Sequence, residues 1–407
     1  MRFPVHARVC KAIALAALAL AILLLTITSG ALAQTETIIH SFTGESDGGE
    51  PIGGLISDAN GNLYGVTEVG GANFAGSVFE LTPSSNGTWT ETVIFSFSFE
   101  GNGGVIPGAS VVFDKQGNLY GEAEGGANGA GVIFELSPGA NGVWTETVLY
   151  NFTGGTDGSS GFLSGLAIDA AGNLYGTTQS GGTYNFGTAF VLVHGSNGTW
   201  TKKILHNFSQ NNDGGLPYAE NLTLDSAGNV YGTTLNGGAY DYGVVFELVR
   251  GSNGSFSEKV LHSFTGGDGG SGAEGGLTFD ASGNLYGCTA NTVYQLVPTA
   301  SGEWTINILH EFMGGSDGAD AGSAVTFDKA GDLYGNTDNG GRHRGTVFEL
   351  IPHDGTWTEK ILHRFAESGN DGTFPFFSQL VIDSHGNLYG TAAGGGSGEG
   401  VVYEVTP

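Results

Sequence analysis

The sequence has few cysteines and few basic residues, and both shortages narrow what the protein can be. Of its two cysteines, Cys10 precedes the long apolar run and only Cys288 follows it. The chain after residue 33 therefore has no internal disulfide, and its stability must come from packing and strand pairing. There are 13 basic and 40 acidic residues, and three of the basic ones precede residue 34, so the rest carries a net charge of about −30. Such a surface repels nucleic acid and anionic lipid, and we expect neither as a partner.

The only long apolar run lies at the N-terminus. Basic residues precede the apolar stretch 12–27, and Ala31-Leu32-Ala33 fits a cleavage site. We predict a signal peptide over residues 1–33 and an exported chain that is secreted, at the cell surface or periplasmic. No later stretch reaches the roughly 18 apolar residues of a membrane-spanning helix. We therefore expect no membrane insertion after cleavage.

One motif recurs along the whole remaining chain. It reads Gly-Asn-Leu-Tyr-Gly with small variations, at intervals of about 55 residues, and its copies begin at Gly61, Gly117, Gly172, Gly228, Gly283, Gly331 and Gly386. Around each copy lie four runs rich in β-branched and aromatic residues, bounded by turn residues. This pattern predicts an all-β, seven-bladed β-propeller over residues 34–407, with four antiparallel strands per blade. A solenoid is the alternative.

The two ends of the repeat region favour the ring over the solenoid. The region opens with a lone fourth-strand run at 36–42 and stops at a third-strand run, 401–405. If the N-terminal strand completes the last blade, the ring closes and no strand edge needs a cap. We therefore predict that residues 36–42 form the closing strand of the seventh blade.

The repeat resembles a known family. Gly172 to Thr178, the following Gly181-Gly182 and the run from Val347 to Leu350 are similar to the Gloeo/Verruco repeat family of exported bacterial proteins. The resemblance covers the chain after residue 33 and implies a propeller-like repeat protein. It implies no catalytic residues, because structural repeats define that family.

Two kinds of turn carry acidic residues. Asp58-Ala59-Asn60-Gly61 and its six equivalents fit tight turns in which Asp accepts backbone N–H groups, although the pattern is also similar to calcium loops. The interblade loops carry a second acidic set, Asp47, Asp157, Asp213, Asp268, Asp317 and Asp371, each followed by Gly. These loops are long and share a face with the loops between second and third strands, so we expect any binding site on this long-loop face.

We expect the second set of carboxylates to surround the channel mouth. A carboxylate ring attracts Ca²⁺ or a cationic ligand, and calcium binding through Asp157, Asp213 and Asp317 is one hypothesis. The simpler interpretation is that Asp-Gly makes a turn in each blade.

Only two blades break the repeat visibly. Blade 5 goes from Cys288-Thr289 directly to Thr292 and lacks the Gly-Gly loop. Blade 6 carries the basic run Arg342, His343 and Arg344 in its long loop. A notch between these blades is the best candidate for a pocket. Glu45, Glu50, Glu274 and Asp320 add acidic charge that differs from blade to blade, which a turn alone does not require.

Repeated aromatic and histidine positions are interpreted as packing. His40, His206, His262, His310 and His363 share one position, which Phe95 and Tyr150 fill in two other blades. A position that accepts Phe and Tyr is a packing position rather than a catalytic one. The tryptophans that begin the fourth strands are interpreted in the same way, with a sugar-binding rim as the alternative. We expect Cys288 to be an inert core thiol.

These observations predict an exported, monomeric, non-enzymatic binding or scaffold protein that recognises a polysaccharide, peptide or surface ligand through the long-loop face. The first alternative is a propeller enzyme of the lyase or lactonase type that acts at the channel mouth. The second alternative is a purely structural cell-surface component. No cofactor is expected apart from Ca²⁺.

Overall fold

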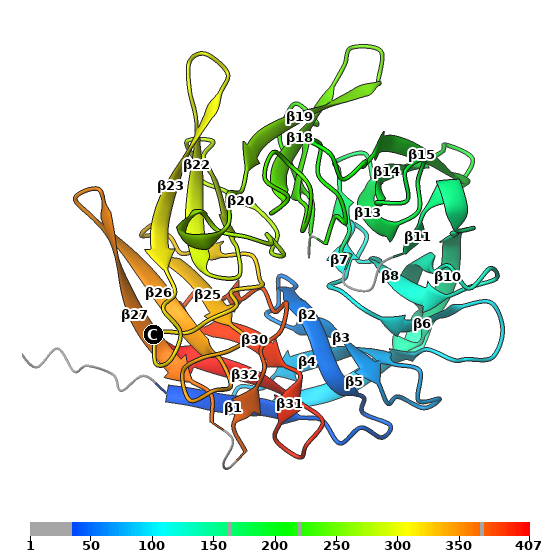
Figure 1. Cartoon of the computed structure of the whole chain (residues 1–407). Coiled ribbons are helices and arrows are strands. Elements are labelled where there is room, and N and C mark those ends of the chain that lie inside the picture. Colours follow the sequence, from blue (N-terminus) through cyan, green and yellow to red (C-terminus); the bar gives the residue numbers. More distant parts are fainter. Residues whose placement is uncertain (1–34, 161–163, 219–220, 367–369) are drawn as a thin grey trace, which may run out of the picture.

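The computed structural model describes residues 35–160, 164–218, 221–366 and 370–407. Its strands form a ring of seven antiparallel sheets, which confirms the predicted seven-bladed propeller (Figure 1). The predicted signal peptide over residues 1–33 lies outside the described residues. Within those residues, no helix has both the length and the apolar character needed to cross a membrane.

Each blade is one sheet that runs from the central channel outward. From the inner to the outer strand, blade 1 contains β2 (Gly49–Ser57), β3 (Leu63–Val69), β4 (Ser77–Pro83) and β5 (Trp89–Ser96). Blade 2 contains β6 (Gly104–Pro107) with β7 (Val112–Phe113), β8 (Leu119–Gly125), β9 (Val132–Pro138) and β10 (Trp144–Asn151). Blade 3 contains β11 (Ser159–Ser160) with β12 (Ala167–Ile168), β13 (Leu174–Ser180), β14 (Thr188–His194) and β15 (Trp200–Asn207). Blade 4 contains β16 (Thr223–Leu224), β17 (Val230–Thr233), β18 (Val244–Arg250) and β19 (Phe256–Ser263).

The last three blades follow the same order. Blade 5 contains β20 (Thr278–Phe279), β21 (Leu285–Cys288), β22 (Thr292–Pro298) and β23 (Trp304–Glu311). Blade 6 contains β24 (Thr326–Phe327), β25 (Leu333–Thr337), β26 (Thr346–His353) and β27 (Thr356–Arg364). Blade 7 contains β29 (Val381–Ile382), β30 (Leu388–Ala392), β32 (Val401–Thr406) and β1 (Thr35–Ser41). The pair β28 (Gly372–Thr373) and β31 (Gly394–Gly395), and the short 3-10 turns η1 (Ala140–Gly142), η2 (Gly155–Asp157) and η3 (Gly267–Gly269), lie in loops.

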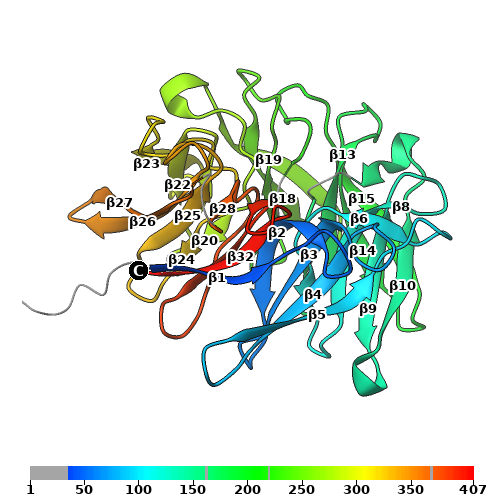
Figure 2. The ribbon, with the colours of Figure 1, turned by 90° about the horizontal axis from the view of Figure 1, so that it is seen from below.

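The N-terminal strand closes the ring as predicted. β1 pairs with β32 in antiparallel register from Glu36 opposite Val405 to Ser41 opposite Val401. Figures 1 and 2 both show β1 beside the last strand of the chain. The backbone N–H of Phe42 then bonds the carbonyl of Gly400 at 2.9 Å. Blade 7 is thus assembled from both ends of the described chain.

The Asp-x-x-Gly segments are tight turns, as the sequence predicts. In the first copy Asp58 accepts hydrogen bonds from the backbone N–H groups of Asn60 and Asn62 at 2.8 and 2.9 Å. The φ angle of Gly61 is 84°, a conformation that glycine adopts without a steric penalty. In the other copies too, Asp accepts a backbone N–H two residues further on. These carboxylates therefore serve the turn.

The core lies between neighbouring blades. A phenylalanine that follows each outer strand packs edge-to-face on a ring of the next blade, as Phe42 does on Phe79 at 5.1 Å. The strand-four histidine packs on the same phenylalanine, as His40 does on Phe42 at 4.5 Å. Trp89 packs on Tyr389 of the preceding blade. The packing interpretation of these repeated positions is therefore confirmed, and Cys288 is buried in the core.

Replacing Phe42 by alanine should destabilise the ring where it closes. The side chain is fully buried, and truncating a buried phenylalanine costs about 3–5 kcal/mol. Phe99, which is 64% exposed, provides the matched control, and Phe99→Ala should change stability by less than about 0.5 kcal/mol. Equilibrium denaturant unfolding of both variants measures the difference. Equal stabilities would contradict the role given to the closing segment.

Candidate functional site

A pocket of about 270 Å³ lies in the notch between blades 5 and 6. The short connection between β21 and β22 leaves Ala290 on one wall, where other blades have a longer loop. Glu274 precedes the innermost strand of blade 5, and Phe376 precedes that of blade 7. The pocket therefore opens at the channel mouth on the long-loop face, where the sequence predicted it.

Three carboxylates line this pocket, from Glu274, Asp320 and Asp338. The Asp338 side chain is buried, and its backbone N–H bonds the carbonyl of Asp320 at 2.9 Å. The amide of Asn339 donates to the Asp320 carboxylate at 2.7 Å. Burial, followed by the charge of Asp320, raises the pKa of Glu274. The site therefore concentrates negative charge in a partly desolvated place.

The backbone holds two of the lining residues in a strained conformation. The φ angles of Asp320 and Phe374 are 58° and 59°, in a region that residues other than glycine rarely adopt. The N–H of Phe374 bonds the carbonyl of Arg344 in the preceding blade at 3.1 Å, which ties the interblade loop to its neighbour. Strain of this kind persists where the surrounding structure enforces it, often at functional sites.

Aromatic rings close the floor of the mouth. Phe376 packs edge-on against Phe377 at 4.0 Å, and Phe377 contacts Tyr218 of blade 4 at 5.5 Å. Burial, then the charge of Glu274, raises the pKa of Tyr218 to about 12. A second cavity, of about 310 Å³, is lined by residues from all seven blades. The mouth is thus a shallow acidic chamber with an aromatic base.

Further acidic groups reach the mouth from blades 1 and 2. Burial raises the pKa of Glu68 to about 7, with smaller contributions from the charges of Glu50 and Glu124. A neighbouring open depression of about 590 Å³ is lined by Glu50, Arg344 and Phe374. The guanidinium of Arg344 lies over the Phe374 ring, 4.7 Å from its centroid.

The three residues of the basic run of blade 6 lie in two different environments. Arg344 is half-buried and lines the depression beside the notch. Arg342 and His343 are exposed and do not line either cavity.

The interblade aspartates do not surround the channel mouth, which corrects that expectation. Five of the six accept a hydrogen bond from a backbone N–H at the start of their own loop: Asp47, Asp157, Asp213, Asp317 and Asp371. Their other contacts include loop hydroxyls, such as that of Ser209 on Asp213, and outer-strand side chains: His206 bonds Asp213 at 3.1 Å and His363 bonds Asp371 at 3.0 Å. The carboxylate therefore caps the end of the outer strand, far along the blade from the channel. Asp268 lies in η3 of the corresponding loop.

Asp157, Asp213 and Asp317 lie in three different interblade loops, and the structure does not bring them together. The described residues contain two groups, each of one histidine and two carboxylates, in which the ligand atoms lie within 4.8 Å of one another. Each group contains one interblade aspartate. The acids at the mouth were visible in the sequence only as departures from the repeat, and side-chain direction could not be read from spacing.

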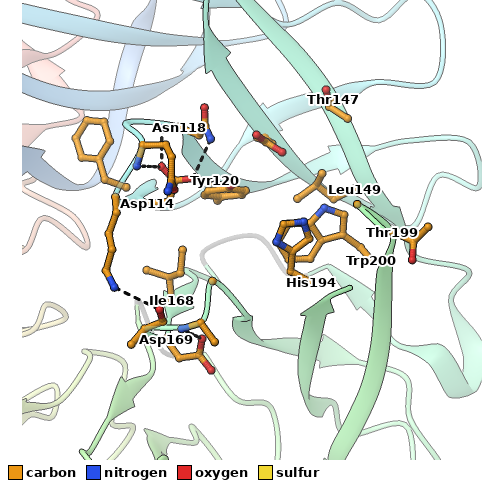
Figure 3. Close-up of a pocket in the computed structure, with 18 of the residues that line it drawn as sticks. Asp114, Asn118, Tyr120, Thr147, Leu149, Ile168, Asp169, His194, Thr199 and Trp200 are labelled. Carbon is orange, nitrogen blue, oxygen red and sulfur yellow. Dashed lines mark hydrogen bonds between the residues drawn. The ribbon is translucent and has the colours of Figure 1, made fainter. Parts of the chain in front are cut away.

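A larger groove, of about 1020 Å³, lies on the opposite face between blades 2 and 3. Figure 3 shows its walls: Asp114, Asn118 and Tyr120 come from blade 2, and His194 and Trp200 from blade 3. His194 is exposed and stacks on Trp200 with centroids 4.5 Å apart. The sequence did not indicate this groove, because its walls come from short turns.

The His194–Trp200 pair breaks the repeat. In blades 1, 2, 5 and 6 the residue opposite the outer-strand tryptophan is proline: Pro83, Pro138, Pro298 and Pro352. In blade 3 it is His194. The substitution adds an exposed, stacked aromatic face to the groove of about 1020 Å³.

Comparison with known proteins agrees with this architecture. A profile of the Gloeobacter/Verrucomicrobia repeat matches residues 25–190 and 147–295. No curated protein matches the chain by sequence. Virginiamycin B lyase from Staphylococcus aureus is a similar solved structure, with 14% identity, a TM-score of 0.53, and coverage of 92% of this chain and 99% of the lyase.

Two further structures have the same fold. The extracellular domain of the putative one component system BT4673 from B. thetaiotaomicron has 13% identity and a TM-score of 0.57, covering 92% of this chain and 40% of that chain. A putative 6-phosphogluconolactonase from Bacteroides uniformis has 12% identity and a TM-score of 0.52, covering 83% and 93%. At these identities the likeness shows the fold alone.

The acidic mouth should make stability depend on pH through Glu68. Its folded-state pKa of about 7 lies above the ordinary value of 4.5, so the folded state binds the proton more tightly. The associated stability is present below about pH 4.5 and is lost as the pH rises towards about 7. Glu68→Gln should therefore flatten the fall in unfolding free energy between about pH 5 and about pH 8. The exposed Glu100→Gln variant is the control, and an unchanged slope in Glu68→Gln would refute this assignment.

Proposed function

The chain belongs to the Gloeobacter/Verrucomicrobia repeat family, and we propose that this member is an exported binding protein whose channel mouth takes a primary ammonium group, as on a lysine side chain of an extracellular peptide. The observation that carries the proposal is the pocket of the notch, which combines the carboxylates of Glu274, Asp320 and Asp338 with Phe374 and Phe376.

The shape of the pocket favours an organic cation over a bare metal ion. A metal ion needs ligand atoms that converge on one point at about 2–2.6 Å. Among the described residues, the convergent ligand groups lie elsewhere, and the three mouth carboxylates are spread around a cavity of about 270 Å³. An ammonium group has three donors and reaches several carboxylates at hydrogen-bond distance.

The surroundings of the pocket support the same ligand class. Phe374 is 37% exposed, and an aromatic face within about 6 Å attracts a cation. The ring already carries the Arg344 guanidinium on one side. The net charge of about −30 after residue 33 draws cations to the protein over a Debye length of about 8 Å. The rigid ring holds the site ready before the ligand arrives.

Glu274→Gln combined with Asp320→Asn should weaken binding of an N-acetylated lysine tripeptide by at least tenfold. Each lost charge-assisted hydrogen bond is worth about 1.5–3 kcal/mol, and about 1.4 kcal/mol is a factor of ten in affinity. Isothermal titration calorimetry at physiological salt measures the change.

The control double variant is Glu303→Gln with Asp354→Asn, which removes the same charge from exposed hairpins of the opposite face. It should bind within about twofold of the parent. Equal losses in both double variants would show that only the overall charge acts, and would refute the site. If the parent protein hydrolysed members of a lactone panel and Glu68→Gln abolished that hydrolysis, the result would support the enzyme alternative instead.

A second candidate function, saccharide binding, rests on the groove between blades 2 and 3. Its stacked His194 and Trp200 present an aromatic surface for the C–H face of a sugar ring, and Asp114, Asn118 and Glu135 offer polar partners for hydroxyl groups. In blade 2 Glu135 bonds Ser137 at 2.9 Å. The equivalent glutamate in blade 1, Glu80, instead accepts from Tyr64.

His194→Ala should reduce retention on a neutral polysaccharide array by about tenfold, the equivalent of about 1.4 kcal/mol. His385→Ala, which removes an exposed histidine from a turn on the same face, should leave retention unchanged. The array is run with calcium and with a chelator, so that a calcium-bridged ligand is recognised. Retention that is the same for both variants would exclude the groove.

A further inference from the structure

The outer strands of neighbouring blades meet in an arrangement that repeats around the ring. We call this meeting place a seam: the outer strand of one blade, the interblade loop that follows it, and the outer strand of the next blade. Three sequence positions define each seam. They are the strand-four histidine or its replacement, the loop aspartate or its replacement, and the residue two positions after the Trp, or its equivalent, that begins the next outer strand.

The seam between blades 5 and 6 contains His310 from β23, Asp317 from the loop and Glu359 from β27. Nε2 of His310 lies 3.5 Å from Oδ1 of Asp317 and 3.6 Å from Oε1 of Glu359. These separations are long for hydrogen bonds. Ligand atoms about 2.1 Å from a tetrahedral Zn²⁺ lie about 3.4 Å from one another. The observed spacing therefore fits ligands around a small cation.

The seam between blades 6 and 7 has the same composition. His363 from β27 and Asp371 from the loop meet Glu36, which lies on the closing strand β1. Nε2 of His363 is 3.0 Å from Oδ1 of Asp371, and the three ligand atoms lie within 4.8 Å of one another. An ion here would tie the N-terminal strand to the blade beside it.

The protein orients these ligands in advance. In both seams a backbone N–H, from Met313 or Ala366, bonds Oδ2 of the aspartate and leaves Oδ1 facing the imidazole. The histidine rings are held edge-on at 4.8 Å by Phe312 and by Phe365. Support of this kind, outside the ligands themselves, is what metal sites require.

Several of these atoms are buried without a hydrogen bond in the described part of the chain. They are Oε1 of Glu36, Oε1 of Glu359 and Nε2 of His310. A buried polar atom without a partner is costly. A cation between blades 5 and 6 would satisfy the atoms of His310 and Glu359, and a second cation between blades 6 and 7 would satisfy that of Glu36.

An independent observation shows that the seam accepts a cation. Between blades 2 and 3 the glutamate position is Lys202, whose side chain is only 3% exposed. Its Nζ lies 3.0 Å from Oδ1 of Asp157, and the histidine position is Tyr150, which donates to the same carboxylate. The ammonium group thus occupies the place where the other seams collect ligand atoms.

The remaining seams vary in a consistent way. Two keep all three residue types but do not bring the three ligand atoms within 4.8 Å: His40, Asp47 and Glu91, and His206, Asp213 and Glu258. Two others lack ligands: the seam between blades 1 and 2 has Phe95 and Asn102 at the histidine and aspartate positions, and the seam between blades 4 and 5 has Ile306 at the glutamate position.

We propose that a divalent cation of the Zn²⁺ class binds in two seams, held by His310, Asp317 and Glu359 and by Glu36, His363 and Asp371, with water as the fourth ligand. One imidazole and two carboxylates are ligands suited to this class, and a tetrahedral site with three protein ligands leaves one position open. The ions act as cross-links between blades in a chain without a disulfide after residue 33. The second ion secures the closing strand.

The test uses the chain from residue 34 after exhaustive chelation, titrated with ZnCl₂. Calorimetry and elemental analysis should give about two Zn²⁺ per chain, and thermal unfolding should shift upward with Zn²⁺ by mass action. Glu36→Gln and Glu359→Gln should each remove one equivalent, and together they should remove both. The matched control is Glu146→Gln. Glu146 has the same strand position in the seam between blades 1 and 2, where Phe95 replaces the histidine, and this variant should leave the stoichiometry at two.

A gain-of-function variant keeps the test decisive if the loss variants fold poorly. Tyr150→His combined with Lys202→Glu rebuilds the triad between blades 2 and 3 and should raise the stoichiometry from about two to about three. In the parent chain, Co²⁺ should show the intense visible absorption of a tetrahedral site with these ligands. Three results would each overturn the proposal: no Zn²⁺ bound, a stoichiometry unchanged in the double loss variant, or a thermal shift produced by Ca²⁺ and not by Zn²⁺.

Discussion

The antiparallel pairing of β1 with β32 joins strands from opposite ends of the described chain in one sheet. With this pair in place, every blade has a neighbour on both sides and the apolar faces of the sheets are covered all round. Without it, two blade faces would be open, and the edge of β32 would be free to pair with other chains. The absence of disulfides makes this pairing, and the phenylalanine contacts that follow it, the main cross-link of the ring.

A closed ring of near-identical blades leaves function to the places where the repeat is broken. Gly65 shows how strictly the shared positions are constrained, because a Cβ there would lie 2.6 Å from the Phe79 ring. The short connection of blade 5, by contrast, opens a notch, and Asp320 and Glu274 fill its rim with charge. His194 departs from proline at the groove between blades 2 and 3. Both candidate sites are therefore local departures on a scaffold that the repeat keeps rigid.

The number of blades, the strands of each blade, the Asp-x-x-Gly turns and the ring closure were all predictable, because each is repeated or follows from counting strands. The notch was predictable because blade 5 is visibly shorter. The direction of the interblade aspartates was not predictable. Five of the six accept a hydrogen bond from a backbone N–H four or five residues earlier, as in the bonds from Ser209 to Asp213 and from Ala366 to Asp371. The seam triads were hidden for a related reason, since they join two outer strands that are far apart in the sequence, as His310 and Glu359 are, and as Glu36 and His363 are.

The histidine position shows how one sequence position can serve two purposes. Its acceptance of Phe95 and Tyr150 correctly indicated packing, and His310 and His363 do pack on phenylalanines. The same rings direct Nε2 towards carboxylates from the loop and from the next blade. Packing and ligation are therefore compatible at this position, and repetition alone is not a reason to exclude a site.

The most direct test of the central claim is a crystal structure of the chain from residue 34 with an N-acetylated lysine tripeptide. We expect the lysine ammonium in the notch between blades 5 and 6, within hydrogen-bond distance of the carboxylates of Glu274 and Asp320 and against the Phe374 ring. Density for the peptide only on the opposite face, or an empty notch at a peptide concentration that saturates binding in solution, would contradict it.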